Sequence, residues 1–169
     1  MKKIIVINGA GGVGKDTLIG FAEERYQVMN ESSIDPIKDA AKALGWDTCM
    51  KRDKDRKFLS DLKLLATEYN DCSMKHIHKK CLRFLDSSYQ ILFVHIRETK
   101  EIQRFVEHAQ AWFSIKPITL LVRRDAVMHE YGNMADDGVE GYKYDYYFDN
   151  NGTLKDAEKA FAALLEEMA

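Results

Sequence analysis

Residues 2–20, KKIIVINGAGGVGKDTLIG, decide how this chain folds. The apolar run Ile4–Ile7 predicts a strand, and the apolar periodicity from Leu18 onward predicts an amphipathic helix. Between them, Gly9, Gly14 and Lys15 have the spacing of the phosphate-cradling pattern G-x-x-x-x-G-K. A strand before the pattern and a helix after it are the context that this loop requires. We therefore predict a phosphate-binding loop rather than an ordinary turn.

The residue types of this loop suit a polyphosphate. Glycines let the backbone curl around an anion with its N–H groups pointing inward. The free N–H groups at the start of the helix add partial positive charge, and Lys15 supplies a full charge for the outer phosphates. The residues expected to bind the nucleotide here are Gly11, Gly12, Val13, Gly14, Lys15, Asp16 and Thr17.

Asp16 stands where this pattern usually has Ser or Thr, whose hydroxyl normally ligates magnesium. A carboxylate beside phosphates is repelled unless a cation lies between them. We therefore expect Asp16 or the hydroxyl of Thr17 to hold Mg²⁺. The alternative for Asp16 is a first-turn acid that favours the helix dipole.

Composition sets wider limits. A length of 169 residues fits one domain, and 46% hydrophobic with 31% charged residues is ordinary for a globular protein. A net charge of −2 gives no reason to expect a nucleic-acid or membrane partner. The N-terminus leads straight into a strand, so we expect no signal peptide. Three cysteines at irregular spacing are typical of reduced thiols, which predicts a cytoplasmic protein. We expect it to be a monomer or a homodimer.

Further apolar runs predict strands at Gln27–Asn30, Gln90–Ile96, Pro117–Val122 and Tyr144–Phe148. Helical patterns separate them. Strands that alternate with helices after a phosphate loop indicate an α/β fold with three α/β/α layers, as in P-loop NTPases, and a mostly parallel sheet of about five strands. The single domain, residues 1–169, would carry a helical substrate-side insertion over about 35–88 and a lid-like segment over about 124–143.

The helical patterns are specific enough to assign faces. Asp35 is a candidate N-cap for a helix that stops at Gly45, and Thr153 with Asp156 resembles a capping box. Three sets of apolar residues share a helix face: Phe58, Leu62, Leu65 and Tyr69; Met74, Ile77, Cys81 and Phe84; and Leu154, Ala157, Phe161, Leu164 and Met168.

His76 and His78 lie two residues apart, so on a helix they point to different sides. No third ligand stands at a suitable spacing, and we therefore expect surface histidines rather than a zinc site.

Basic residues follow two of the predicted strands. In open α/β sheets ligands bind at the carboxyl ends of the strands. Arg97 is therefore a candidate phosphate ligand, with a surface arginine as the alternative. Arg123 and Arg124 are either a clamp on the phosphates in the transition state or solvated loop charges.

Several segments together resemble the deoxynucleoside monophosphate kinase family and the related animal-type phosphomevalonate kinases. Gly9–Thr17 is similar to their phosphate loop, and Ser33–Lys38 to the Pro-Leu-Lys element that opens their substrate-side helix. Leu65–Glu68 resembles a Gly-Thr-Glu element, with Ala66 in place of glycine, and His95–Arg97 an Asp-x-Arg strand end. Tyr144–Gly152 resembles a terminal Asp–Asn-Gly element of P-loop kinases.

This resemblance implies transfer of the γ-phosphoryl group of ATP, with Mg²⁺, to a phosphate already on a small acceptor. It implies that Asp35, Lys38 and Arg97 bind the acceptor and that Arg123 and Arg124 take the charge in transfer. Asn150 and Asn151 would line the adenine pocket.

The chain departs from the family pattern at His95, which replaces the strand-end Asp, and in its acidic lid. Three functions stay open. The first is a kinase for (deoxy)nucleoside monophosphates. The second is a kinase for a non-nucleotide phosphate such as phosphomevalonate. The third is a nucleotide-binding protein that has lost catalysis.

Overall fold

The computed structural model describes residues 2–49, 52–128 and 138–168. Five parallel strands form one sheet in the order β2-β3-β1-β4-β5. The strands are β1 (Lys3–Asn8), β2 (Val28–Ser32), β3 (Ile91–His95), β4 (Ile118–Arg123) and β5 (Tyr146–Asp149). This arrangement confirms the predicted α/β fold, and its sheet is parallel throughout.

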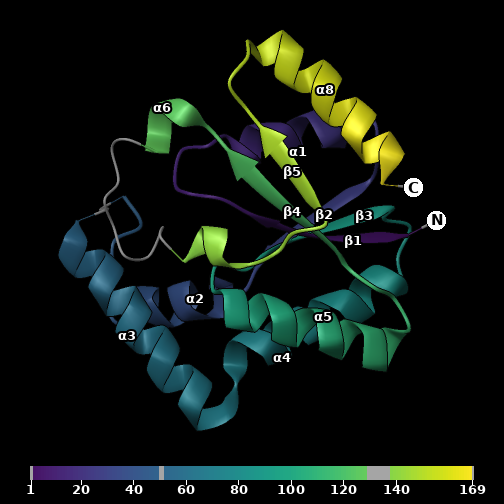
Figure 1. Cartoon of the computed structure of the whole chain (residues 1–169). Helices are drawn as coiled ribbons and strands as arrows, with labels where there is room; N and C mark the ends of the chain where they lie inside the picture. The colour runs from purple at the N-terminus through teal and green to yellow at the C-terminus, as the bar shows by residue number, and fades with distance from the viewer. Residues whose placement is uncertain (1, 50–51, 129–137, 169) are drawn as a thin grey trace.

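Helices cover both faces of the sheet (Figure 1). They are α1 (Lys15–Glu23), α2 (Asp35–Ala43), α3 (Asp53–Asn70), α4 (Cys72–Leu85), α5 (Thr99–Phe113), α6 (Asp125–Met128) and α8 (Leu154–Glu167), with a 3₁₀ turn η1 at Val139–Gly141. Helices α1 and α8 lie on one face, whereas α4 and α5 lie on the other. Within the described residues, no helix is both long and apolar enough to cross a bilayer.

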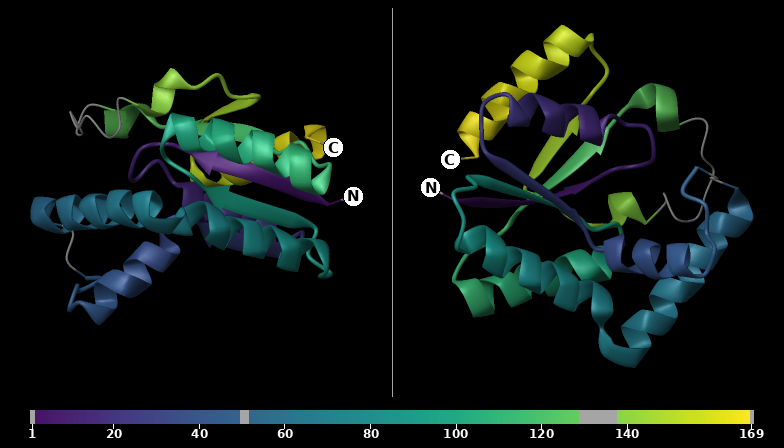
Figure 2. Two further views of the ribbon diagram at one scale, coloured as in Figure 1. Left: turned by 90° about the horizontal axis from the view of Figure 1, so that it is seen from below. Right: turned by 180° about the vertical axis from the view of Figure 1, so that it is seen from behind.

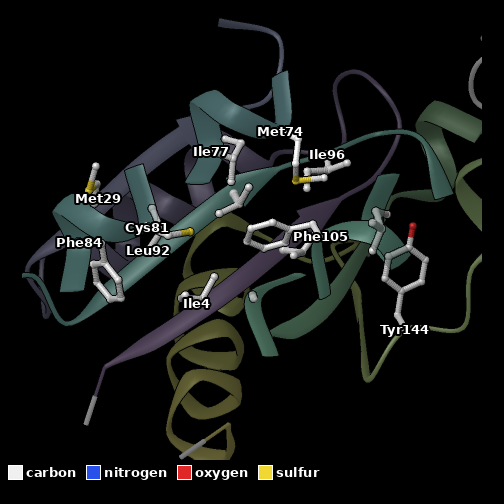
Figure 3. Close-up of a cluster of buried hydrophobic side chains, with 14 of the residues drawn as sticks. Ile4, Met29, Met74, Ile77, Cys81, Phe84, Leu92, Ile96, Phe105 and Tyr144 are labelled. Atoms are coloured by element: carbon white, nitrogen blue, oxygen red, sulfur yellow. The ribbon is translucent and has the colours of Figure 1, made fainter. Parts of the chain in front are cut away.

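The continuous apolar runs of the central strands follow from this double cover. Along β1, Ile5 and Ile7 pack with α1 and α8, and Ile4 and Val6 pack with α4 and α5. Figure 3 shows the second cluster, where Phe105 and Ile77 meet the sheet. The predicted inward face of α4 is confirmed, because Met74, Ile77, Cys81 and Phe84 are all buried.

Helix α3 behaves differently from α4. It extends beyond the sandwich (Figure 2, left), and Asp55 is the one buried residue among its eighteen. Its predicted apolar side chains lie partly or largely in solvent: Phe58 is 37% exposed, Leu65 63% and Tyr69 84%. The helix was predicted correctly, but this face is not covered by the described part of the chain.

Several local predictions are adjusted. Helix α2 begins at Asp35 itself, one residue earlier than an N-cap assignment requires, and the Asp35 carboxylate accepts the backbone N–H of Ser32 at 2.9 Å. The capping box of Thr153 and Asp156 is confirmed. Leu154 is 72% exposed rather than inward, because it is the first residue of its helix. Residues 129–137 of the expected lid lie outside the described residues.

Candidate functional site

The carboxyl ends of all five strands meet at one edge of the sheet. Strand pairing places His95 beside Ile7 on one side and beside Ser32 on the other. It also places Arg123 beside Asp149. The phosphate loop, the β3 end and the two arginines therefore lie on the same side of the molecule, where ligands bind in open α/β folds.

The backbone of the phosphate loop needs its glycines. Gly9, Gly12 and Gly14 have φ angles of 143°, 84° and 96°, a region that L side chains rarely adopt. A Cβ on Gly9 would lie 2.4 Å from the Val122 carbonyl oxygen, and one on Gly14 would lie 2.5 Å from Asn150 Nδ2. The loop thus combines left-handed backbone with close approach to its neighbours.

Two asparagines hold this loop in place. The buried Asn8 side chain accepts the N–H of Gly9 at 2.8 Å and donates to the Tyr144 hydroxyl at 2.8 Å and to the Arg97 carbonyl at 3.1 Å. Asn150 Nδ2 donates to the Val13 carbonyl at 2.8 Å. The loop is therefore fixed by the segment after β3 and by residues on either side of β5, as well as by its own sequence. The sequence analysis missed Asn8, although its place directly before the glycines was a usable signal.

Lys15 and the two residues after it lie at the mouth of the loop. The Lys15 ammonium donates to the carbonyls of Gly9 and Ala10, at 2.6 and 2.9 Å. Asp16 and Thr17 are exposed in the first turn of α1. Their carboxylate and hydroxyl oxygens are the hard donors that Mg²⁺ prefers. The residues present therefore fit a magnesium ion beside the phosphates.

His95 ends β3, where the phosphate loop and the start of α2 meet. Its Nε2 lies 2.8 Å from Asn30 Oδ1. Burial lowers the pKa of His95 below its usual value, and the Lys15 charge lowers it further, while Asp16 and Asp35 oppose the shift. A neutral imidazole, rather than a carboxylate, therefore lies between the two candidate phosphate sites.

Two of the cations that the sequence suggested for an acceptor, Lys38 and Arg97, lie near His95 in space or in sequence. Lys38, on α2, is close enough for its charge to act on His95, and Arg97 follows two residues later. Within the described parts of the chain, neither side chain forms an ion pair. The neighbouring Glu98 is bound instead to Lys63 of α3 at 2.6 Å, and this pair lowers the pKa of Glu98 against the effect of burial.

Arg123 and Arg124 differ in their surroundings. The Arg123 guanidinium binds both carboxylate oxygens of Glu140 and lies over the Tyr147 ring, 4.6 Å from its centroid. These contacts raise the pKa of Arg123, whose Glu140 bond is the main cause. Arg124 is exposed. The sequence did not indicate Glu140 as the partner of Arg123, because the two residues come from different segments, on either side of residues 129–137.

Asn150 and Asn151 both bind backbone. The Asn151 side-chain oxygen accepts the Asp125 N–H at 2.9 Å, and the Asn150 backbone N–H donates to the Arg123 carbonyl at 2.8 Å. The turn after β5 thus connects the phosphate loop to the segment that follows β4. Contact of either asparagine with adenine stays a prediction.

Comparison with known proteins supports the fold. No family model matches the sequence, and no curated protein matches it. Solved structures do match across nearly the whole chain. The tunicamycin resistance protein of Deinococcus radiodurans superimposes with a TM-score of 0.60 at 16% identity, covering 98% of this chain and 96% of that one.

Two further structures agree. A sugar kinase from Janibacter sp. HTCC2649 has a TM-score of 0.55 at 12% identity, covering 98% and 95% of the two chains. Shikimate kinase from Aquifex aeolicus has a TM-score of 0.50 at 10% identity, covering 97% and 96%. The chain therefore has the fold of P-loop small-molecule kinases.

Proposed function

We propose that this protein is an ATP-dependent phosphotransferase that acts on a phosphate already carried by a small acceptor, foremost a (deoxy)nucleoside monophosphate. The observation that carries the proposal is that cationic residues lie at one sheet edge, where they can form two anion sites. The phosphate loop with Lys15 forms the first, and Lys38 with Arg97, which form no ion pair with the described residues, form the second. Three free cysteines support a cytoplasmic location.

In this proposal the chain positions and neutralises charge. The loop N–H groups and Lys15 bind the β- and γ-phosphates of ATP, and Lys38 and Arg97 orient the acceptor phosphate. An acceptor oxygen forms a bond to the γ-phosphorus as the bond to the β,γ-bridging oxygen breaks, and ADP leaves. Mg²⁺ held by Asp16 or Thr17 supplies further charge neutralisation when bound. Arg123 and Arg124 would face the transferring group.

A phosphate acceptor and an alcohol acceptor make different demands on the residue at the end of β3, which is His95. An alcohol must lose a proton as it attacks, and a positioned carboxylate often accepts that proton. A phosphate monoester is largely ionised near neutral pH and needs no base. The residue at the end of β3 is an imidazole bonded to Asn30, and imidazole is itself a common general base. His95 therefore does not separate the two acceptor classes, and the choice rests on the cations Lys38 and Arg97.

A second candidate is a nucleotide-binding protein without turnover. The contact that favours it is the binding of Arg123 to Glu140, which occupies one of the two arginines proposed for the transition state. This reading predicts that ATP stabilises the protein while no acceptor stimulates ADP formation.

The test is ADP release from Mg-ATP with a panel of ribo- and deoxynucleoside monophosphates and with phosphomevalonate. Lys15→Ala is the blank, and we expect it to lower turnover at least about 100-fold, because it removes charge from the transferring phosphate. Lys159→Ala, at an exposed position of α8, is the matched control and should retain activity.

The outcomes separate the candidates. Stimulation by a nucleoside monophosphate supports the proposal, and stimulation by phosphomevalonate alone reassigns the acceptor. If no acceptor raises ADP release above the acceptor-free rate, the kinase proposal is wrong. Thermal stabilisation by ATP in that case supports the second candidate.

A further inference from the structure

Three side chains from three elements converge where β2 ends. Glu31 lies on β2, Asp35 begins α2, and His76 is on α4, which packs against both. One ligand-type atom of each lies within 4.8 Å of the other two. The three residues lie far apart in the sequence, which is why the spacing of His76 and His78 gave no sign of a site.

The imidazole of His76 has no hydrogen-bond partner in the described part of the chain. Its Nε2 is a buried atom without a donor or acceptor in reach. The nearest carboxylate oxygen, Glu31 Oε2, is 3.8 Å away, which is beyond hydrogen-bond distance. A buried polar nitrogen without a partner is costly, so the arrangement calls for a group between these atoms.

The carboxylates of Glu31 and Asp35 each bind one donor and keep a second oxygen atom available for a ligand. Glu31 Oε1 accepts the Lys80 ammonium at 2.8 Å, which leaves Oε2 toward His76. The Asp35 carboxylate is fixed by the N–H of Ser32. Glu31 is only 14% exposed. Two carboxylates against one ammonium leave one negative charge that a cation can neutralise.

We propose that Glu31, Asp35 and His76 form a binding site for a borderline divalent transition metal such as Zn²⁺, with Co²⁺ as its spectroscopic substitute. One imidazole nitrogen and two carboxylate oxygens are a ligand set that such ions accept, whereas Mg²⁺ prefers oxygen alone. Ligands of tetrahedral zinc lie about 3.3 Å apart, so these side chains need to close slightly. Three protein ligands leave one position for water.

This site uses other residues than the magnesium position at Asp16 and Thr17, and it shares Asp35 with the expected acceptor side. It joins β2, α2 and α4, and α2 carries Lys38. A bound metal would therefore fix the acceptor-side helix to the sandwich. Because the metal alone is the ligand, the proposal does not depend on the kinase assignment.

The experiment is a Co²⁺ titration of the full chain without nucleotide, followed by visible absorption and by thermal unfolding, and repeated with Zn²⁺. We expect one Co²⁺ per chain, no thiolate-to-cobalt charge-transfer band, and a rise in unfolding temperature. His76→Ala and Glu31→Gln should each weaken binding at least about tenfold, because each removes a ligand.

His78→Ala is the matched control. His78 lies on the same helix, and its Nδ1 is 2.7 Å from His108 Nε2, so this pair is the competing place for a metal. The control should bind Co²⁺ as the unaltered chain does. The proposal is wrong if the unaltered chain binds no Co²⁺, if His76→Ala and Glu31→Gln bind it normally, or if His78→Ala abolishes binding. If His76→Ala does not fold by circular dichroism, Glu31→Gln decides, with Asp35→Asn as the repeat.

Discussion

The phosphate loop and helix α3 are built in opposite ways. The loop is rich in glycine, yet two side chains bind its backbone: Asn8, which directly precedes it, and Asn150, which follows the distant strand β5. Helix α3 is eighteen residues of regular structure, yet within it Asp55 alone is buried. The irregular loop is therefore the better supported by tertiary contacts, and the regular helix α3 is the less supported.

This difference fits the tasks proposed for them. Catalysis by electrostatic stabilisation requires donors that are already in position, and the supported loop provides them. Helix α3 depends on local pairs such as Lys57 with Asp61, four residues on, and on the bond of Lys63 to Glu98. Elements with few buried contacts open at low free-energy cost, so we expect α3 to adapt more readily than the loop.

Of the two loop changes Gly14→Ala and Asn150→Ala, Gly14→Ala should have the larger effect. The added Cβ meets Asn150 Nδ2 at 2.5 Å on a backbone with φ 96°, and such strain costs about 1–3 kcal/mol. We expect lower thermal stability and a fall of at least about tenfold in ATP affinity, measured by calorimetry.

Gly20→Ala is the control for that change. Gly20 lies within α1 and a Cβ there meets nothing within 4 Å. Alanine should therefore stabilise the helix by up to about 1 kcal/mol. Equal ATP affinity in the two variants would contradict the account of the loop.

Asn150→Ala tests whether the Asn150 side chain holds the loop in place. The change removes the bond to the Val13 carbonyl and should weaken nucleotide binding by about 1–2 kcal/mol. If Asn150 acts only by positioning the loop, affinities for ATP and GTP fall by the same factor. A selective loss of ATP would instead place Asn150 at the adenine. Asn151→Ala, which leaves the Val13 bond intact, is the comparison.

His95 lies where the loop and the acceptor side meet, and it predicts a pH effect. Its pKa is lowered in the folded state, so folding disfavours its protonation. Stability is therefore full above the unfolded pKa of about 6.5 and falls as pH drops through the folded value. In urea unfolding between about pH 7.5 and about pH 5.5, His95→Gln should lose less stability than the unaltered chain. An identical loss would show that this histidine is not the cause.

Leu65→Ala should have the smallest effect. Leu65 is 63% exposed, and we expect a change below about 0.5 kcal/mol in the free energy of unfolding. The matched change on the next helix, Ile77→Ala, removes a side chain that is 1% exposed and should cost about 2–5 kcal/mol. If chemical denaturation showed similar losses in the free energy of unfolding for both variants, Leu65 of α3 would be buried in solution.

The sequence predicted what local pattern determines. The central strand runs were found because both faces of the sheet are covered, which makes Ile4–Ile7 of β1 and every residue of β3 before His95 apolar. The loop was found because its glycines and lysine have fixed spacing. Exposure of α3 could not be predicted, because periodicity identifies an apolar face but not whether another element covers it. Likewise, the pairing of Arg123 with Glu140 and the bonds of Asn8 to Tyr144 and Arg97 are set by tertiary contacts, which spacing does not encode.

The bond from Asn150 to Val13 joins positions 137 residues apart. A motif that is synthesised at the start of the chain is thus completed by one of its last turns. During synthesis the glycines emerge before the residue that binds the Val13 carbonyl. If the loop binds ATP as proposed, we expect its full affinity only after β5 has joined the sheet.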